Sequence, residues 1–560
     1  MKEPCPGDGS AVHALAIALL AAAPLVAFLH SNHYPLATAE VGLLLLACVA
    51  AGLVGGLVAK LGTTVAALVL GAAVALSIDL MYDLGPSKLL LALVPVASLA
   101  LAWILRQHIA LVVAAASLVF LVTTVVIPGT GPGDVRRTNV VAGEGAAGAS
   151  DVPTLVHLIL DEHIGIDGLP TALPESAAVA RGLTEYYLER GFRLNTGAYS
   201  EYVDTRNSLA NLVNFSSRDD RWAHLVEGKA EPYLLKDSAY FQRLERMGYR
   251  LHVYQSDHMD FCGVPGVRYA ACFDYSAHHI APLYETPTGT IERARFIFNG
   301  FMLGSSYIGR LREKYGKLRD ALPGWHLPAW TPGASRVGPL PVLPVLRRLE
   351  EDLSRAGPGN AYFAHLLIPH YPYVLDESCE IRREVSQWLY NVPPVPTSRL
   401  VQNTEATWAE RYRRYFAQIG CQQALLDRLF ESMKKSGLWN KAIIIVHGDH
   451  GSRIMRNVPV TLNAERLTRS DFNDSFSTLF AVRLPGEQGG IVSGPRSLQQ
   501  LLGEALGLPV ESSPPKVYLR ADEERKFHAF ELAAFHEDGN GMRHVKRPPV
   551  AARAVGGGVQ

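Results

Sequence analysis

The sequence has no excess of charge of either sign, because Lys plus Arg and Asp plus Glu both total 53 among 560 residues. A general nucleic-acid binder usually carries a basic excess, so we expect no nucleic acid among the partners. Cysteine is also scarce, with six in the whole chain. We find no internal repeat. The length exceeds what one ordinary core supports, which predicts at least two structural units.

Charged residues are almost missing from the first 128 residues, which are nearly continuously apolar. A cleaved signal peptide would explain only the first part of this region. Buried helices of a soluble protein are the alternative, but so few charges over this length favour a multi-pass membrane domain at 1–128. Its five candidate spans, each near the length that crosses a bilayer, are residues 11–30, 36–58, 64–82, 88–105 and 109–127.

Four basic residues near the spans indicate the orientation. With the N-terminus in the cytoplasm, Lys2, Lys60 and Arg106 lie on the cytoplasmic side and only Lys88 lies outside. Five crossings then place the rest of the chain on the extracytoplasmic side of the cell membrane. Asp79, near the outer end of the third span, is either functional, as carboxylates inside a membrane often are, or simply has access to the interface.

Beyond the apolar part the sequence has the texture of a globular protein. Residues 129–152 are rich in Gly, Pro and Ala and predict a flexible tether. Apolar strands then alternate with helices, which predicts an α/β domain at 153–520 whose mostly parallel sheet is sandwiched by helices. A C-terminal tail follows at 521–560. We interpret the Pro- and Gly-rich region 281–345 as an insertion near the site or the membrane.

The expected elements follow from periodicity and from helix start and stop signals. Strands are expected at residues 154–160, 192–195, 249–254, 362–368 and 442–446. Helices are expected at residues 173–190 and 404–436, with another starting near Ser208 and one around Phe241.

Four of the six cysteines lie in the predicted α/β domain. Cys262 and Cys272 enclose a short loop, while Cys379 precedes a polar stretch and Cys421 begins the helical segment before the last strand. An oxidising compartment permits disulfides, and we predict the pairs 262–272 and 379–421, one of three possible connectivities. Free buried thiols are the alternative.

Two of the expected strands end in acidic and imidazole side chains. The strand at 154–160 is followed by Asp161 and Glu162, and the strand at 442–446 by His447-Gly448-Asp449-His450-Gly451. Ligands collect beyond the carboxyl ends of buried parallel strands, and Asp, Glu and His together suit a hard or borderline cation. The two strand ends therefore predict one metal-centred site.

Each half of this site also has a simpler explanation. Adjacent carboxylates such as Asp161 and Glu162 can cap a helix or face water. Asp449 and His450 can belong to a structural turn, although the flanking glycines allow the tight bend that two ligands would need. We expect His447 to support that turn rather than to bind metal.

A nucleophile and a proton donor are the remaining parts of such a site. The segment 199–209 offers three hydroxyls near the start of a helix, on Ser200, Thr205 and Ser208. A cation stabilises an alkoxide there and the helix amides favour an anion, but N-capping explains each hydroxyl equally well. His370 ends a buried strand at the same edge and can bind a substrate anion or protonate a leaving oxygen, although a lone His in a Pro-rich turn is often structural.

Four motifs, taken in order, resemble those of the sulfatase and alkaline phosphatase superfamily. They are Leu158-Ile159-Leu160-Asp161-Glu162, Thr205-Arg206-Asn207-Ser208-Leu209, Pro369-His370-Tyr371-Pro372 and Gly448-Asp449-His450-Gly451. The resemblance covers about residues 153–510 and, with the membrane part, extends to lipoteichoic acid synthases and lipid A phosphoethanolamine transferases. It implies an alkaline-phosphatase-like fold. It also implies one divalent ion (Mn, Mg, Ca or Zn) held by Asp161, Asp449 and His450, with Glu162 matching the second carboxylate of sulfatases.

The sequence departs from sulfatases at the nucleophile. Their Cys/Ser-x-Pro-x-Arg signature, which is oxidised to formylglycine, is replaced by Tyr202-Val203-Asp204-Thr205-Arg206. The resemblance to transferase-type relatives therefore implies Thr205 as the nucleophile, and Arg206 and His370 are the predicted substrate contacts.

The function implied is that of a hydrolase or transferase acting on a phosphate or sulfate ester of an envelope lipid or glycan, with the lipid bilayer as its other partner. Because the sulfatase signature is missing, a catalytically inactive scaffold with the same fold is the alternative. A transporter with an accessory outer domain ranks below both, since the spans show no repeat.

Overall fold

The computed structural model describes the chain in segments. The described residues are 8–82, 84–85, 87–126, 136–137, 151–227, 232–276, 280–322, 327, 337–388, 401–508, 514–521, 526–531, 535–537 and 543–545. The predicted tether at 129–152 therefore lies almost wholly outside the described residues, as does most of the predicted tail. The chain divides into two compact units. The helical unit comprises residues up to 134 with 278–337 and 381–388, and the sheet unit comprises the rest.

The apolar part of the helical unit folds as five helices. They are α1 (Asp8–Ser31), α2 (Ala39–Ala59), α3 (Thr63–Tyr82), α4 (Lys88–Ile104) and α5 (Ile109–Val126). Four of them are long and apolar enough to cross a membrane, so the prediction of five crossing helices is corrected to four. The exception is α4, whose 17 residues rise about 26 Å at 1.5 Å each, short of the roughly 30 Å hydrocarbon core.

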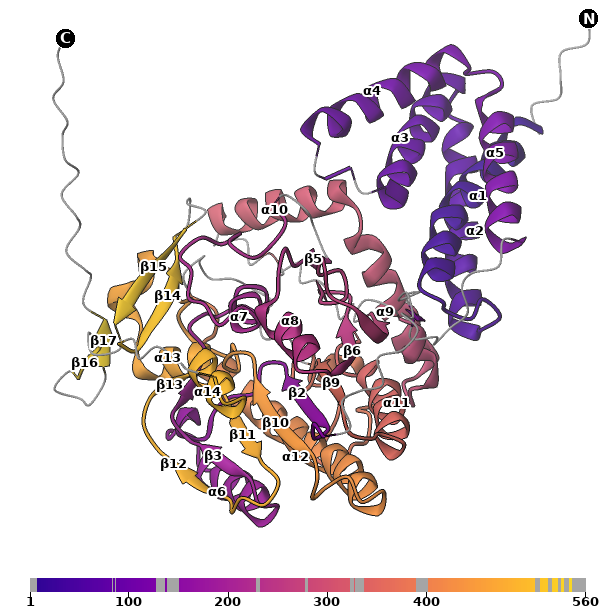
Figure 1. Cartoon of the computed structure of the whole chain (residues 1–560). Helices are drawn as coiled ribbons and strands as arrows, with labels where there is room; N and C mark the ends of the chain where they lie inside the picture. Colours follow the sequence, from indigo (N-terminus) through magenta and orange to yellow (C-terminus); the bar gives the residue numbers. More distant parts are fainter. Residues whose placement is uncertain are drawn as a thin grey trace, which may run out of the picture. The chain divides into compact units, whose positions relative to one another are not determined.

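The helical unit also contains two helices from the region expected to be an insertion. These are α9 (Thr290–Leu303) and α10 (Ser306–Ala321), which follow each other in Figure 1. In this unit α9 packs against α2, and α10 packs against α3. Sequence alone did not predict these helices.

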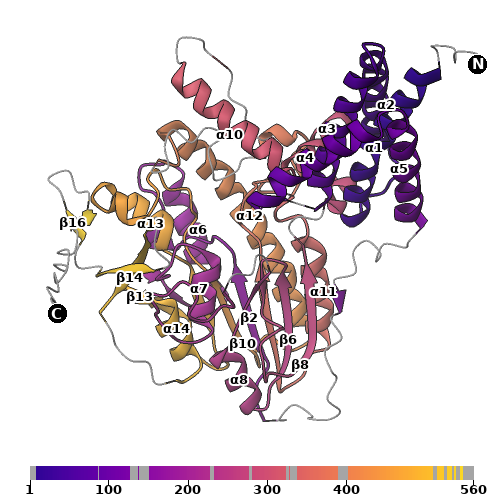
Figure 2. The same cartoon turned by 90° about the horizontal axis from the view of Figure 1, so that it is seen from above.

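The sheet unit is built on a nine-stranded mixed sheet (Figures 1 and 2). In spatial order the strands are β1 (Arg136–Arg137), β8 (Tyr269–Tyr275), β6 (Arg250–Ser256), β9 (Asn360–Leu366), β2 (Leu155–Leu160), β10 (Ile443–Gly448), β11 (Phe480–Arg483), β3 (Arg193–Asn195) and β12 (Gly490–Val492). The five strands from β8 to β10 are parallel to their neighbours. The β1 and β11 strands pair antiparallel. The mostly parallel sheet agrees with the prediction.

Helices cover both faces of the sheet. One face packs on α7 (Thr205–Leu212), α8 (Ala239–Arg246) and α14 (Leu498–Ala505) through a core that includes Ile159, Phe241 and Phe363. In Figure 2, α11 (Val342–Ser354) and α12 (Glu405–Lys435) lie behind the strands, on the other face. The helix α6 (Ser176–Glu189) packs beside β3.

Short elements complete the unit. They are β4 (Ala198–Tyr199), β5 (Tyr233–Leu234), β7 (Met259–Asp260), α13 (Arg469–Phe476), β13 (Arg496–Ser497), β14 (Lys516–Arg520), β15 (Phe527–Glu531), β16 (Phe535–Glu537) and β17 (Arg543–Val545). Because β14 pairs with β15 and buries Phe527 and Phe530, the folded part continues beyond the boundary predicted at residue 520. The structure pairs Cys262 with Cys272 and Cys379 with Cys421, the two disulfides that were predicted.

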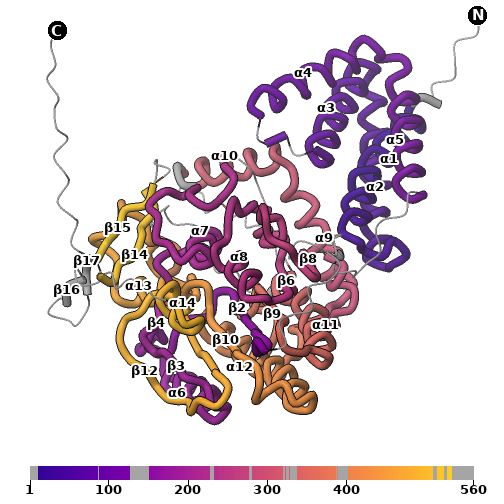
Figure 3. The backbone as a smooth tube through the Cα atoms, viewed as in Figure 1, coloured from indigo at the N-terminus to yellow at the C-terminus, as the bar shows by residue number. Residues whose placement is uncertain are grey.

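The strand register brings three strand ends to one level. Leu160 of β2 lies opposite Gly448 of β10 and Leu366 of β9, and these three strands lie side by side in the middle of the unit (Figure 3). All six residues of β2 are buried, as expected for a parallel strand covered on both faces. The polar residues that follow each strand therefore leave the sheet at the same edge.

Candidate metal centre

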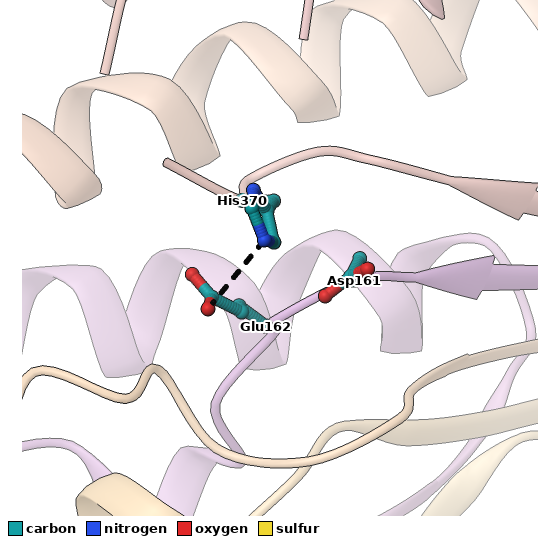
Figure 4. Close-up of side chains that lie close together, drawn as sticks. All are labelled: Asp161, Glu162 and His370. Carbon is teal, nitrogen blue, oxygen red and sulfur yellow. Dashed lines mark ion pairs between the residues drawn. The ribbon is translucent and has the colours of Figure 1, made fainter. Parts of the chain in front are cut away.

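Acidic and imidazole side chains from three neighbouring strands meet at this edge. Possible ligand atoms of Asp161, His365 and Asp449 all lie within 4.8 Å of one another, and so do those of Asp161, Glu162 and His370. Figure 4 shows the second group, with His370 facing Glu162 and Asp161 at the end of β2. The structure thus brings together Asp161 and Asp449, which are 288 positions apart in the sequence.

Asp161 is buried and only half satisfied. Its Oδ2 lies 3.1 Å from His365 Nε2, while its Oδ1 is buried without a hydrogen-bond partner. Burial acts to raise the pKa of Asp161, but His370, His365 and His450 together lower it below its ordinary value. An ionised carboxylate oxygen without a donor is a costly group unless a cation binds it.

Asp449 and His450 present a matching pair of atoms. His450 Nδ1 lies 2.9 Å from Gly451 O, and because a carbonyl can only accept, Nδ1 carries the proton and the neutral ring has its lone pair on Nε2. That Nε2 lies 3.1 Å from Asp449 Oδ2, which makes no hydrogen bond. A carboxylate oxygen and an imidazole lone pair at this separation fit two ligands of one ion.

Glu162 lies on the same turn with a different set of neighbours. Its backbone has φ of 63°, an uncommon conformation for a residue with a side chain, and its N–H donates to Asp449 Oδ1 at 3.0 Å. Its Oε1 lies 3.6 Å from Arg453 Nη1 and 3.7 Å from His370 Nε2. Burial raises the pKa of Glu162, and Asp161 and Asp449 raise it further against the opposing effect of Arg453.

The three candidate hydroxyls have different environments. Thr205 is the first residue of α7, and its Oγ1 lies 3.1 Å from His450 Nε2. Ser208 Oγ donates to Asp449 O, and Ser200 Oγ pairs with Ser208 Oγ at 2.9 Å. The N-cap of α7 is none of these hydroxyls but Asp204, whose side chain accepts from Asn207 N. Thr205 is therefore the hydroxyl that faces the metal-ligand candidates, and the two serines hold the turn.

Arg206 follows Thr205 in α7 and is held by aromatic rings. Its guanidinium lies 4.7 Å from the centroid of the Tyr233 ring and 5.9 Å from that of Trp222, a distance range in which cation–π attraction is effective. Asp204 is the nearby anion, at 3.8 Å from Arg206 Nε. The predicted role of Arg206 in substrate binding stays a prediction.

The long helix α12 positions the loops that carry Glu162 and His370. Tyr415 OH donates to Glu162 O at 2.6 Å, and Gln418 Nε2 donates to the carbonyls of Pro369 and His370. His370 Nδ1 lies 2.5 Å from Tyr371 O, so by the same rule for carbonyls it carries the proton and Nε2 faces Glu162. Two loops far apart in the chain are fixed by one helix face.

Two glycines of the Gly-Asp-His-Gly turn are needed for close backbone approach. A Cβ atom on Gly448 would lie 2.4 Å from His163 O, and one on Gly451 would lie 2.5 Å from Asp474 O. Neither glycine has a positive φ. The left-handed positions near the site are instead Glu162 and Arg453, which sequence analysis did not identify.

Sequence analysis missed His365 and Arg453. A signal for His365 was present, because each of the three central strands carries one histidine among apolar residues, namely His157 in β2, His365 in β9 and His447 in β10. In register, Ile159 of β2 lies between His447 and His365, so all three histidines lie on one face of the sheet. No pattern pointed to Arg453.

His157 and His447 form a buried, directional chain of hydrogen bonds. Since His447 Nδ1 faces Gly448 O at 2.7 Å, it is the donor there, and its Nε2 accepts from His157 Nε2 at 2.7 Å. His157 Nδ1 then accepts from Tyr240 OH, also at 2.7 Å. Every polar ring atom is satisfied with both rings neutral, and the chain ends on the turn that carries Asp449.

The stability of the fold should therefore fall as the pH falls below about 6.5. Burial lowers the pKa of His157 well below its ordinary value and that of His447 to about 4. Between these values the unfolded chain takes up protons that the folded chain excludes, so stability is complete above about pH 6.5 and is lost toward pH 4. His447 alone should cost about 3 kcal/mol over this range.

Urea unfolding of the detergent-solubilised full chain, followed by tryptophan fluorescence from pH 7.5 to 4.5, would measure this slope. A His157→Phe/His447→Leu variant should show a shallower decline than the original protein. Equal slopes in the two proteins would show that this pair is not the source of the pH dependence.

Comparison with known proteins places this fold and site. No family model matches the chain. The lipoteichoic acid synthase of Staphylococcus aureus (strain USA300) is 27% identical over 136 residues, which are 24% of this chain and 18% of the synthase. The C-terminal periplasmic domain of EcEptC from Escherichia coli has a TM-score of 0.39 at 12% identity, covering 70% of this chain and 95% of that chain. For LtaP from Listeria monocytogenes the values are 0.36, 12%, 69% and 86%.

The fold and the site define an α/β protein with a candidate metal centre, joined to apolar helices of membrane-spanning length. The predicted resemblance to the sulfatase and alkaline phosphatase superfamily is confirmed, and the similarity to lipoteichoic acid synthase within it is distant. Because the match spans less than a fifth of the synthase, the activity of that enzyme does not transfer directly to this chain.

Proposed function

We propose that the protein is a membrane-anchored, metal-dependent enzyme that hydrolyses or transfers a phosphate or sulfate ester of an envelope lipid or glycan. The observation that supports it best is that the Thr205 hydroxyl lies 3.1 Å from His450 Nε2, on a helix N-terminus. That nitrogen lies in turn beside an unsatisfied oxygen of Asp449. A nucleophile, a cation site and an anion-favouring helix start thus coincide.

The residues present fit one divalent cation. Asp161 Oδ1, Asp449 Oδ2 and His450 Nε2 would hold it, with Glu162 as the second-choice carboxylate. Carboxylates alone suit Mg²⁺ or Ca²⁺, whereas the added imidazole favours Zn²⁺ or Mn²⁺. When bound, such an ion lowers the pKa of a nearby hydroxyl and neutralises charge that develops on the ester oxygens.

The chain's own side chains would then carry the group transfer. Thr205 Oγ1 attacks the phosphorus or sulfur in line, so that an ester bond to Thr205 forms as the bond to the leaving oxygen breaks. His370, whose side chain is 16% exposed, would give the leaving oxygen its proton. Water or an acceptor hydroxyl then attacks the Thr205 ester and restores the threonine, which separates hydrolysis from transfer only by the acceptor.

We place the catalytic residues on the extracytoplasmic side of the membrane. Lys60 lies between α2 and α3, and with Lys2 it favours a cytoplasmic position for that end of the hairpin. Glu40 at the start of α2 and Asp79 near the end of α3 lie at the opposite end, and they contact Arg293 and Ser305 of the insertion. The two disulfides are also typical of an exported domain. This assignment does not depend on the path of α4.

The test is turnover by the purified full-length protein after chelation and metal return. Aryl phosphate, bis-aryl phosphate and aryl sulfate would each be assayed with EDTA and then with Mn²⁺, Mg²⁺, Ca²⁺ or Zn²⁺. We expect activity on at least one ester that disappears with chelator and returns with one of the ions. If no ester is cleaved and no ion binds stoichiometrically, the inactive scaffold is the correct function.

A further inference from the structure

The insertion is attached to the apolar helices by a buried ion pair. Glu40 of α2 is 1% exposed, and its Oε1 lies 3.1 Å from Arg293 Nε of α9. Arg293 Nη2 also donates to Glu40 Oε2 at 3.2 Å, and Tyr34 OH donates to Oε1 at 2.5 Å. A buried carboxylate is tolerated when it is paired and hydrogen-bonded in this way. Glu40 therefore fixes the position of α9 on the helical unit.

A second carboxylate fixes the start of α10. Asp79 is fully buried, and its Oδ2 accepts from Ser305 Oγ at 2.6 Å and from Tyr307 N at 3.0 Å. Ser305 is the N-cap of α10, and an acidic group at a helix N-terminus is favourable. Of the two explanations that sequence left open for Asp79, the structure supports a specific role, because its partners are residues of the insertion.

Both contacts lie at the same end of the α2–α3 hairpin. Glu40 is the second residue of α2, and Asp79 is three residues from the end of α3. Since these helices run in opposite directions, their start and end lie at the same membrane surface. Tyr307 OH also donates to Leu91 O near the start of α4. The first turn of α10 therefore lies where the apolar helices leave the hydrocarbon.

The sequence of α10 has the pattern of a helix that lies in a membrane surface. At about 100° per residue, the side chains of one face are Tyr307, Ile308, Leu311, Tyr315 and Leu318. Basic residues flank that face on both sides, with Arg310, Lys314 and Lys317 on one side and Arg312 and Arg319 on the other. Basic residues beside an apolar stripe are typical of helices that bind anionic lipid surfaces.

Exposed apolar side chains are concentrated in this insertion. Among the described residues beyond 128, nine large apolar side chains are exposed, and three of them lie elsewhere, at Met247, Leu462 and Ile491. The other six are Tyr284, Ile291, Phe298, Leu303, Leu311 and Leu318. Leu311 and Leu318 are 53% and 52% exposed on the apolar face of α10. Such a cluster marks an interaction surface rather than ordinary solvent exposure.

We propose that α9 and α10 form a lipid-binding surface, with the apolar face of α10 in the headgroup region and Arg310, Lys314 and Lys317 on anionic headgroups. Continuity with the ends of α2 and α3 and the basic flanks identify the occupant as an anionic bilayer surface. This role is independent of the catalytic assignment. It would hold the chain that enters and leaves the insertion at the membrane surface, where a lipid-borne substrate is found.

The depth of α10 can be measured in the full chain. A Cys5→Ser/Cys48→Ala background with Leu318→Cys would be labelled with a fluorophore and placed in nanodiscs that contain lipids brominated near the headgroup. The matched control is Leu462→Cys, which is similarly exposed at 56% but lies in the sheet unit. We expect severalfold stronger quenching at 318 than at 462. Equal quenching, as with solvent exposure or a protein partner, would overturn the proposal.

The charge requirement is tested in the same system. Raising the fraction of phosphatidylglycerol against phosphatidylcholine should increase quenching at 318, and an Arg310→Gln/Lys314→Gln/Lys317→Gln variant should lose that dependence. Lys434→Gln/Lys435→Gln, at the end of α12, is the matched charge control and should keep it. Unchanged dependence in the triple variant would refute headgroup binding by these residues, whatever the outcome of the ester assays.

Discussion

Replacing Asp449 by asparagine will leave the protein folded but without stoichiometric metal, and turnover will disappear with the ion. Asparagine keeps the side-chain volume and an oxygen for the amides of Glu162 and His450, which both donate to Asp449 Oδ1. It removes the negative charge that faces His450 Nε2. Losing a residue that only supports a ligand costs about 10–100-fold in metal affinity, so losing a ligand should cost more than about 100-fold.

The matched control is Asp352→Asn. Asp352 accepts from Tyr254 OH at 2.6 Å and lies in α11, outside both groups of possible metal ligands. After equilibration with Zn²⁺ or Mn²⁺, mass spectrometry of bound metal should give about one ion per chain in the original protein and the control, and none in the Asp449 variant. Full metal content in the Asp449 variant would exclude this residue as a ligand.

Replacing Thr205 by alanine should separate metal binding from chemistry. Asp161, Asp449 and His450 remain, so the metal content should stay near that of the original protein, while turnover falls by at least about 10³-fold for loss of a nucleophile. Thr205→Ser should retain part of the activity because it keeps the hydroxyl.

Ser200→Ala is the control for an ordinary buried hydroxyl near the same turn. Its Oγ donates to Tyr202 O and pairs with Ser208, so its loss should cost about 1 kcal/mol of stability and little activity. Peptide mass spectrometry after rapid acid quenching should show the transferred group on Thr205. Turnover that survives in Thr205→Ala, or a modified Ser208, would identify a different nucleophile.

The parts of the fold that follow from local patterns were predictable. The apolar runs that form β2, β9 and β10 were found within a few residues, since parallel strands covered on both faces are continuously apolar. Because such strands end at one edge, the meeting of Asp161 with Asp449 also followed from sequence. The length of α4 was overestimated, since a run of apolar residues does not reveal where a helix begins and ends.

The contacts that depend on tertiary packing were not predictable. His365 lies inside a strand, so only the register with β2 shows that it reaches Asp161. The choice among Ser200, Thr205 and Ser208 depends on hydrogen-bond partners in other segments. The association of α9 and α10 with the apolar helices rests on single pairs, Glu40 with Arg293 and Asp79 with Ser305, which no periodic pattern encodes.

Anomalous diffraction from crystals of the full-length protein grown with Mn²⁺ or Zn²⁺ tests the central claim most directly. The account predicts one strong peak roughly 2.0–2.2 Å from the ligand atoms of Asp161, Asp449 and His450, with the Thr205 hydroxyl beside it. A peak elsewhere, or Thr205 turned away from an ion bound at these residues, would contradict it.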